Sequence, residues 1–395
     1  MRLRWLGWFT LALLASPATG LELSGSAGVD LRGFFHPPQH PGQRAQSGSA
    51  YIQPELYWSA DNDRNSLVLT PFLRVDSADP ERTHADLREF LYQHVGENWE
   101  LRAGIGKVFW GVVETRHLVD IINQTDLVEN VDGDEKLGQP MVNISFVQDW
   151  GTMDAFLLPY FRERTFPGER GRLRSEPRVE ADAARYESGA ARHRMDWAIR
   201  YSHAMGNWDI GLAHFHGTSR EPALIPTLRA GGAIVLEPLY RVIRQSSLEL
   251  QATLGSWLWK LEAIHRSGDG ETFNAVVGGF EYTVYGIGDS STDVGMLLEG
   301  LYDDRGERAP HPFEGDIFIG ARIALNDEYG TEVLGGLIRD VNQSTTAFTL
   351  EASRRLDDAW TLEAEARIWT GVATNDPQRP LRNDDYVQIT LRRYF

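Results

Sequence analysis

Arginine and carboxylate side chains recur at alternate positions of the extended segments of this chain, and the chemistry they offer is ion pairing. Lysine occurs only three times, as Lys107, Lys136 and Lys260, so nearly all the positive charge is arginine, which stays protonated and holds carboxylates in bidentate pairs. Two interpretations are open: rows of opposite charge brace a wall, or they set a transverse field that orients solutes inside a pore. The residues concerned are Glu22, Asp30, Arg32, Glu55, Arg74, Arg88, Arg102, Arg200, Arg241, Glu249, Lys260, Glu262, Arg322, Glu351, Glu363, Glu365 and Arg367.

The segment from Glu114 to Gln139 combines acidic residues with apolar ones. Its acids are Asp120, Asp126, Glu129, Asp132, Asp134 and Glu135, and its apolar residues are Leu118, Val119, Ile121, Ile122, Leu127, Val128 and Val131. A simple external loop would expose these apolar side chains to water, so we expect residues 114–139 to fold inward and pack on a wall. We predict that the segment is a constriction element, with its carboxylates opposite Arg88 and Arg102.

Two groups of residues have spacings that also suit a metal ion. Asp132, Gly133 and Asp134 resemble part of a calcium loop, but the spacing lacks the full pattern and its closing glutamate. His214 and His216 lie on one face of an expected strand, near its outer rim, where an interfacial pair is the simpler interpretation. We therefore predict no metal and no cofactor.

Signatures of catalysis are missing from the sequence. There is no cysteine, which excludes thiolate metal sites, a cysteine nucleophile and a disulfide framework. There is no Gly-x-Ser-x-Gly elbow and no His-Glu-x-x-His helix. We predict that the protein is not an enzyme, although spacing alone leaves a spatially assembled triad open.

The residues from Arg162 to Arg194 form an arginine-rich stretch in an otherwise acidic protein. A solvated loop is the default interpretation. The functional one is contact with lipopolysaccharide phosphates or capture of anionic solutes outside a pore.

Alternation of apolar and polar residues is the pattern that positions all these side chains. Val387, Ile389 and Leu391 alternate with polar residues, and the same period of two recurs in segments of 9 to 15 residues along the chain. No segment has a long stripe of apolar residues at helical spacing. The chain is therefore predicted to be all-β.

Connections between these segments alternate between tight turns and long loops. The tight ones include 61–65, 96–98, 149–151 and 206–207, and long polar stretches such as 36–48, 77–84 and 162–193 separate them. Low mean hydropathy, −0.35, excludes a bundle of transmembrane helices. An even strand number with short turns on one side is typical of transmembrane barrels, so we predict an antiparallel up-and-down β-barrel of about 18 strands, with 16 as the alternative.

Aromatic residues cluster at the expected strand ends, as in the girdles that mark membrane interfaces. The alternative is that they cover small apolar clusters beside tight turns. The residues are Tyr51, Tyr57, Trp58, Trp99, Trp110, Trp150, Trp208, Trp257, Trp360, Tyr394 and Phe395.

The amino terminus reads as a secretory signal peptide. Arg2 and Arg4 precede an apolar run, and small residues lead to a cleavage position after Gly20. An uncleaved anchor helix is the alternative, but the apolar run is short for a span. We expect residues 1–20 to be removed and residues 21–395 to form a single transmembrane barrel domain.

A signal peptide, alternating strands and a final strand that ends in Phe395 resemble the outer-membrane β-barrels of Gram-negative bacteria. This resemblance implies that Phe395 belongs to the signal read by the barrel-assembly machinery. The chain departs from the usual pattern at Arg393, where an apolar or aromatic residue is common. We expect Arg393 to extend its side chain to water at the rim.

A narrower resemblance covers residues 85–142 and concerns porin-like families of partly unknown function. An Arg-Glu pair, Arg88-Glu89, precedes a glycine-rich strand that ends in Trp110-Gly111, and Asp120 and Asn123 follow. Lys107, Phe109 and Gln124 depart from the usual residues. The resemblance implies a porin-like barrel and identifies no solute.

Together these patterns predict an outer-membrane channel for passive or substrate-preferring diffusion of small solutes. The alternatives are an outer-membrane barrel hydrolase and a secreted soluble β-rich binding protein. Expected partners are small solutes, outer-membrane lipids, lipopolysaccharide and the barrel-assembly machinery, and a net charge of −17 argues against nucleic acid. The predicted pore-lining and constriction residues are Arg74, Arg88, Arg102, Asp120, Asp126, Glu129, Arg322, Glu363, Glu365 and Arg367.

Overall fold

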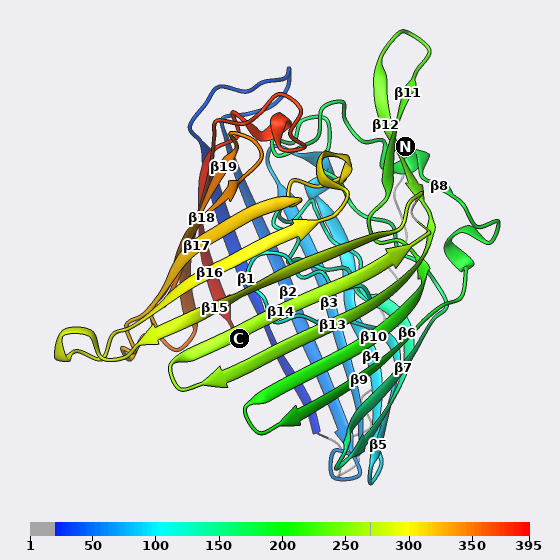
Figure 1. Cartoon of the computed structure of the whole chain (residues 1–395), viewed down its shortest axis with the longest axis vertical. Helices are drawn as coiled ribbons and strands as arrows, with labels where there is room; N and C mark the ends of the chain where they lie inside the picture. Colours follow the sequence, from blue (N-terminus) through cyan, green and yellow to red (C-terminus); the bar gives the residue numbers. More distant parts are fainter. Residues whose placement is uncertain (1–19, 269) are drawn as a thin grey trace, which may run out of the picture.

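The chain closes into a barrel of antiparallel strands (Figure 1). The computed structural model describes residues 20–268 and 270–395, and within them one 18-stranded sheet closes where β1 pairs with β21 as well as with β2. The predicted all-β barrel of about 18 strands is confirmed. Residues 1–19, which hold nearly all of the predicted signal peptide, lie outside the described residues.

The barrel strands are β1 (Gly20–Phe34), β2 (Gln46–Ala60), β3 (Asn65–Asp76), β4 (His84–Val95), β5 (Trp99–Gly106), β6 (Gln139–Gln148), β7 (Gly151–Leu158), β9 (Asp196–Met205), β10 (Trp208–Thr218), β13 (Val242–Leu254), β14 (Trp257–Ser267), β15 (Phe273–Val284), β16 (Asp293–Asp303), β17 (Gly315–Ala324), β18 (Glu332–Asp340), β19 (Thr346–Arg355), β20 (Trp360–Thr370) and β21 (Tyr386–Tyr394). A small sheet outside the barrel contains β8 (Arg185–Tyr186), β11 (Ala223–Leu228) and β12 (Ile234–Tyr240). Short 3₁₀ turns lie at Pro80–Arg82, Ala181–Ala183, Ala191–His193, Ile287–Asp289, Gly306–Arg308 and Arg379–Leu381.

The period of two along each strand separates the two faces of the wall. On β17, Ile317 and Ile319 are 41% and 55% exposed, whereas Phe318 between them is 2% exposed. Successive side chains of a strand point to opposite faces, so the outward face of β17 is apolar while its inward face is covered. A closed barrel with an apolar outer surface belongs in a bilayer, because closure leaves no unpaired backbone edge for lipid to cover.

Connections are sorted between the two ends of the barrel. Tight turns join β2 to β3, β4 to β5, β6 to β7 and β9 to β10, and both β1 and β21 have their chain ends on that side. Long loops and the projecting β11–β12 hairpin gather at the opposite end (Figure 1). In bacterial barrels the short turns face the periplasm and the long loops face outward. In the part of the chain that the structure describes, no helix is long and apolar enough to cross a membrane.

The larger of two buried clusters of apolar side chains in the described residues lies inside the barrel and not in its outer wall. Residues of the 107–138 segment, among them Trp110, Leu118 and Ile122, pack against inward side chains of β7 to β16 such as Phe156 and Phe215. Trp110 is therefore wrongly assigned to the interfacial girdle by the sequence pattern, because its loop carries it into this cluster, where its ring meets Phe156 edge-on.

Candidate functional site: a lumen narrowed by the 107–138 loop

Two buried carboxylates of the barrel wall hold the backbone of the 107–138 loop. Glu262 on β14 is fully buried and accepts hydrogen bonds from the amides of Val112 (2.7 Å), Val113 (3.2 Å) and Val119 (3.2 Å). This arrangement satisfies both the buried charge and three amides that no strand pairs.

Glu299 on β16 repeats the arrangement one step further along the loop. Its carboxylate accepts from the amide of Glu114 at 2.7 Å and from both the amide and the hydroxyl of Thr115, at 3.0 and 2.7 Å. Glu299 is 1% exposed. The loop is therefore attached to β14 and β16 by charge-assisted hydrogen bonds, which are stronger than neutral ones.

The side chain of Asn123 closes the base of the loop. It donates to the carbonyls of Gly106 and Leu137, at 2.9 and 2.8 Å, and accepts from the amide of Val108 at 2.8 Å. The two chain ends that enter and leave the lumen are thus tied to one buried amide. Asn123 belongs to the segment in which the sequence resembles porin-like families.

The opposite side of the loop is tied to the wall by ion pairs. Asp126, which has no exposed surface, pairs with Arg88 at 2.7 Å, and its other oxygen accepts from the hydroxyl of Thr165 at 2.6 Å. Glu129 pairs with Arg74 at 2.8 Å. These contacts fix the position of the loop across the barrel from Glu262 and Glu299.

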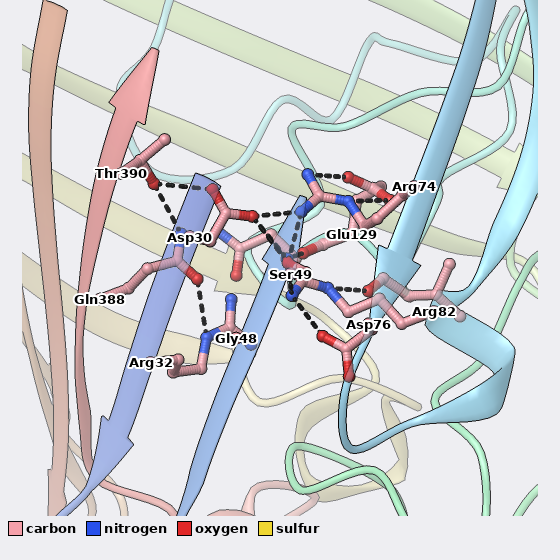
Figure 2. A network of polar contacts seen from close by, with 12 residues as sticks. Asp30, Arg32, Gly48, Ser49, Arg74, Asp76, Arg82, Glu129, Gln388 and Thr390 are labelled. Carbon is pink, nitrogen blue, oxygen red and sulfur yellow. Dashed lines mark hydrogen bonds and ion pairs between the residues drawn. The ribbon is translucent and has the colours of Figure 1, made fainter. Parts of the chain in front are cut away.

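Arg74 is the centre of a polar network between β1, β2, β3 and the loop (Figure 2). Its guanidinium lies between Glu129 and Asp30, and the hydroxyl of Ser49 bonds Asp30 at 3.0 Å. Arg82 donates to the same hydroxyl at 3.0 Å. Figure 2 shows these side chains pointing toward one another from β1, β2, β3, the 3₁₀ turn that holds Arg82 and the loop, so the network braces the wall as well as lining the lumen.

A polar cavity of about 620 Å³ remains between the loop and the wall formed by β1 to β4 and β17 to β21. In the described residues, ten carboxylates and six cationic side chains line it. The carboxylates are Asp30, Glu114, Glu129, Asp132, Asp134, Glu135, Glu332, Glu351, Glu363 and Glu365, and the cations are Arg74, Arg82, Arg88, Lys107, Arg322 and Arg392.

Some of the charges that line the cavity form ion pairs and others do not. Arg322 bonds Glu114 at 2.7 Å, and Arg392 bonds Glu363 at 3.0 Å. Within the described part of the chain, Asp134 and Glu135 make no ion pair. Asp134 and Glu135 lie on the loop side of the cavity, and Glu332, which also makes no ion pair among the described residues, lies on β18. Ten carboxylates against six cations give the cavity a negative excess.

The predicted pore residues divide into two groups. Arg74, Arg88, Glu129, Arg322, Glu363 and Glu365 line the cavity. The other four lie elsewhere: Arg102 bonds Glu100 of its own strand at 3.0 Å, Asp120 bonds Lys136 at 3.1 Å within the loop, Asp126 is buried against Arg88, and Arg367 joins Asp132 and Glu365 behind the surface. Whether the first group controls transport stays a prediction.

Comparison with solved structures gives the fold. No protein-family model and no curated protein matches the chain. The Escherichia coli outer-membrane protein Wzi, described as a carbohydrate-binding β-barrel involved in group 1 capsule assembly, is similar with a TM-score of 0.53 and 9% identity over 93% of this chain and 83% of Wzi. The chain folds as an outer-membrane β-barrel.

Two other outer-membrane proteins are also similar, with lower TM-scores. A mutant of the Rh. blastica porin gives a TM-score of 0.48 at 10% identity over 95% of this chain and all of the porin. A loop-deletion mutant of OmpT, an outer-membrane protein of Vibrio cholerae, gives 0.49 at 9% identity over 96% of this chain and all of that protein.

The closed barrel and its apolar outer surface place this chain in the bacterial outer membrane, which rules out the secreted soluble alternative.

The outer mouth of the barrel is covered on the side of the cavity. Arg172, from the arginine-rich loop, is buried and donates to Asp384 at 2.6 Å and to the carbonyl of Asn383 at 2.7 Å. Leu173 packs with Trp369 and Tyr386. The space beneath this loop has a volume of about 40 Å³, so it is far smaller than the cavity of about 620 Å³ on the other side of Glu129.

The arginines of that loop differ in exposure, since Arg172 is buried whereas the side chains of Arg185 and Arg192 are 59% and 49% exposed. Arg162 pairs with Asp86 at 2.6 Å, and Arg192 bonds Glu163. Capture of external anions or lipid phosphates by this loop stays a prediction.

Sequence reasoning did not single out Glu299. It stands in a mostly apolar strand, Met296 to Tyr302, where a lone carboxylate at an inward position was the available signal. The sequence also did not separate Asp132, Asp134 and Glu135, which face the cavity, from Asp120 and Asp126, which do not.

Proposed function

We propose that this barrel is a channel for small solutes and that it prefers cationic ones. The observation that carries the proposal is the polar cavity between the 107–138 loop and the β17–β21 wall, with its excess of carboxylates. Rings of acidic side chains favour cations in pores. A cavity of about 620 Å³ has the volume of roughly 20 water molecules at about 30 Å³ each, enough for a hydrated ion or a small amine.

The burial of the loop carboxylates supports the idea that a bound cation would stabilise this site. Asp132 lies in the loop beside Asp134, and burial raises the pKa of Asp132 to about 7, while the guanidinium of Arg367 opposes that rise. The crowded carboxylates repel one another in a region with little solvent. A cation in the cavity would relieve this repulsion.

Neutralising the unpaired loop acids tests the proposal. We expect Asp134→Asn with Glu135→Gln to reduce the cation-to-anion permeability ratio by roughly two- to fivefold, because two uncompensated charges leave the narrow part of the lumen. The measurement is the reversal potential of purified protein in planar bilayers under a salt gradient.

Glu97→Gln is the matched control, because it also removes a carboxylate but from an exposed periplasmic turn outside the cavity. Absence of any conductance from folded wild-type protein would refute the channel. A channel whose permeability ratio is the same in wild type, control and loop variant would refute the cation preference alone.

The pKa of Asp132 predicts a pH dependence of selectivity. Below about pH 7 this carboxyl is mainly protonated, and above it the group adds a negative charge to the lumen, so cation preference should increase between about pH 6 and about pH 8. Reversal potentials at both pH values measure this step. Asp132→Asn should abolish it, and a step of the same size in that variant would contradict the assignment.

A further inference from the structure

A second polar cavity of the lumen lies against β7, β9, β10 and β13, away from the cavity described above. It has a volume of about 550 Å³. Val112 of the 107–138 loop and Asp149 of the turn between β6 and β7 both line it, so it extends from the loop to the end of the barrel that carries the tight turns. We call this space the turn-side cavity. It shares no lining residue with the first cavity.

The turn-side cavity ends at the apolar cluster inside the barrel. Along β9, away from its tight turn, the inward residues Ser202 and Arg200 line the cavity, and the next inward residue, Ala198, is buried in the cluster. Along β10, Gly211 lines the cavity and Phe215 belongs to the cluster. The turn-side cavity is therefore a pocket that opens toward the periplasm and not a second pore.

Glu249 on β13 is the buried acid of the turn-side cavity. It is 7% exposed, and one of its carboxylate oxygens bonds Arg200. The other oxygen, Oε2, is buried and has no hydrogen-bond partner among the described residues. Gly211, the direct cross-strand partner of Glu249, leaves the space over β10 into which the carboxylate extends. A buried carboxylate oxygen costs free energy unless a donor satisfies it, so Oε2 marks a position for an N–H or O–H group of a ligand.

Negative groups outnumber positive ones around the turn-side cavity. In the described residues, three carboxylates, one arginine and one histidine line it. Arg200 is already held by Glu249, whereas Asp149 and Asp209 make no ion pair within residues 20–268 and 270–395. The cavity keeps a negative excess even with the histidine protonated, so it favours a positively charged ligand.

The rest of the lining suits an organic cation. Thr152 and Ser202 supply hydroxyl groups, and Val112 supplies apolar surface. In the part of the chain that the structure describes, no three carboxylate or histidine side chains are arranged to hold a metal ion. An ammonium group offers N–H donors to Oε2 of Glu249, and the carbon atoms attached to it would contact Val112.

We propose that the turn-side cavity is a periplasmic binding site for a small organic ammonium ion, with Glu249 as its main acceptor. This site is separate from the first cavity and does not rest on the channel function proposed above. It lies beside an anchor of the 107–138 loop, because the amide of Val112 bonds Glu262 at 2.7 Å and Glu262 is the direct cross-strand partner of Glu249.

The chain has no cysteine, so one introduced thiol can report on this site. Ala204→Cys places the thiol at an exposed lining position without removing a polar group. The measurement is its rate of modification by uncharged methyl methanethiosulfonate, on folded protein in detergent, with butylammonium chloride, sodium butyrate or butanol. We expect saturating butylammonium to slow the modification at least about threefold, and butyrate and butanol to leave the rate unchanged.

Glu249→Gln in the Ala204→Cys background tests the acceptor. It should raise the butylammonium concentration that gives half protection at least about fivefold, because the ammonium group then meets a neutral amide. Glu363→Gln is the matched control, since Glu363 lines the first cavity and not this one. Asp209→Asn changes an exposed side chain and should raise the same concentration about twofold, which keeps the test valid if Glu249→Gln folds poorly.

Equal modification rates with and without butylammonium would overturn the proposal and would mean that water alone satisfies Glu249. Equal slowing by butanol would overturn the preference for an ammonium ion. Protection that is the same in Glu249→Gln, in Asp209→Asn and in the control would overturn the assignment to these carboxylates. Protection should persist when Asp134→Asn and Glu135→Gln are added, so this site and the cation preference of the channel succeed or fail separately.

Discussion

Replacing both Glu262 and Glu299 by alanine should raise single-channel conductance several-fold and destabilise the barrel. These carboxylates hold five backbone amides of the 107–138 loop against β14 and β16. Hydrogen bonds to charged groups contribute roughly 1.5–3 kcal/mol each, and the amides left behind are buried. The loop should therefore leave its position and widen the lumen.

Planar-bilayer recordings measure the conductance. The temperature at which the folded barrel's band on a gel shifts to the position of the unfolded chain measures the stability. Glu363→Ala is the control, because Glu363 lines the same cavity and bonds Arg392 but not the loop. We expect this control to shift ion preference with little change in conductance. Wild-type conductance in the folded double alanine variant would show that the loop does not limit the pore.

The glutamine variants separate charge from shape. Glu262→Gln removes the charge and keeps one carbonyl oxygen, which in the place of Oε1 still accepts from Val112 and Val113 while the new amide donor faces the amide of Val119. Its effect on conductance should be smaller than that of alanine. If glutamine and alanine act equally, the negative charge and not the packing of the side chain holds the loop.

Sequence patterns predicted the wall of this barrel better than its interior. Alternation such as Ile317, Phe318, Ile319 assigns each residue to one face, because the side-chain period of a strand is fixed by backbone geometry. The inward course of the loop also followed from its apolar residues. The face on which a residue lies does not tell how far along the barrel axis it lies, however. Arg102 lies on the inward face of its strand but does not line the cavity.

Which loop acids meet the lumen could not be predicted. Asp120 and Asp134 are similar in sequence context, yet Asp120 turns toward Lys136 within the loop and Asp134 lines the cavity. The path of an irregular segment depends on contacts distant in sequence, here with Glu262 and Glu299, and no local period encodes them. The same holds for Arg172, whose partner Asp384 is over two hundred residues away.

Arg172→Ala should open the outer mouth of the barrel. The guanidinium of Arg172 bonds Asp384 and the carbonyls of His36 and Asn383, and it lies 4.4 Å from the centre of the Phe34 ring. Removing one partner of a buried ion pair costs about 3–5 kcal/mol, because the other charge stays buried without compensation. The cost falls on a loop and not on the sheet, so the loop should detach while the barrel stays closed.

The double variant Arg172→Ala with Asp384→Ala separates detachment of this loop from the cost of a buried charge. Both variants lose the contact that seats Leu173 beside Trp369 and Tyr386, so both should increase conductance and the rate of proteolysis between residues 162 and 194. The single variant should be the less stable one, because only it leaves Asp384 buried and unpaired. Unchanged conductance with faster proteolysis in both variants would mean that the small space below Arg172 does not limit ion flow. The 107–138 loop alone would then set the resistance of the pore.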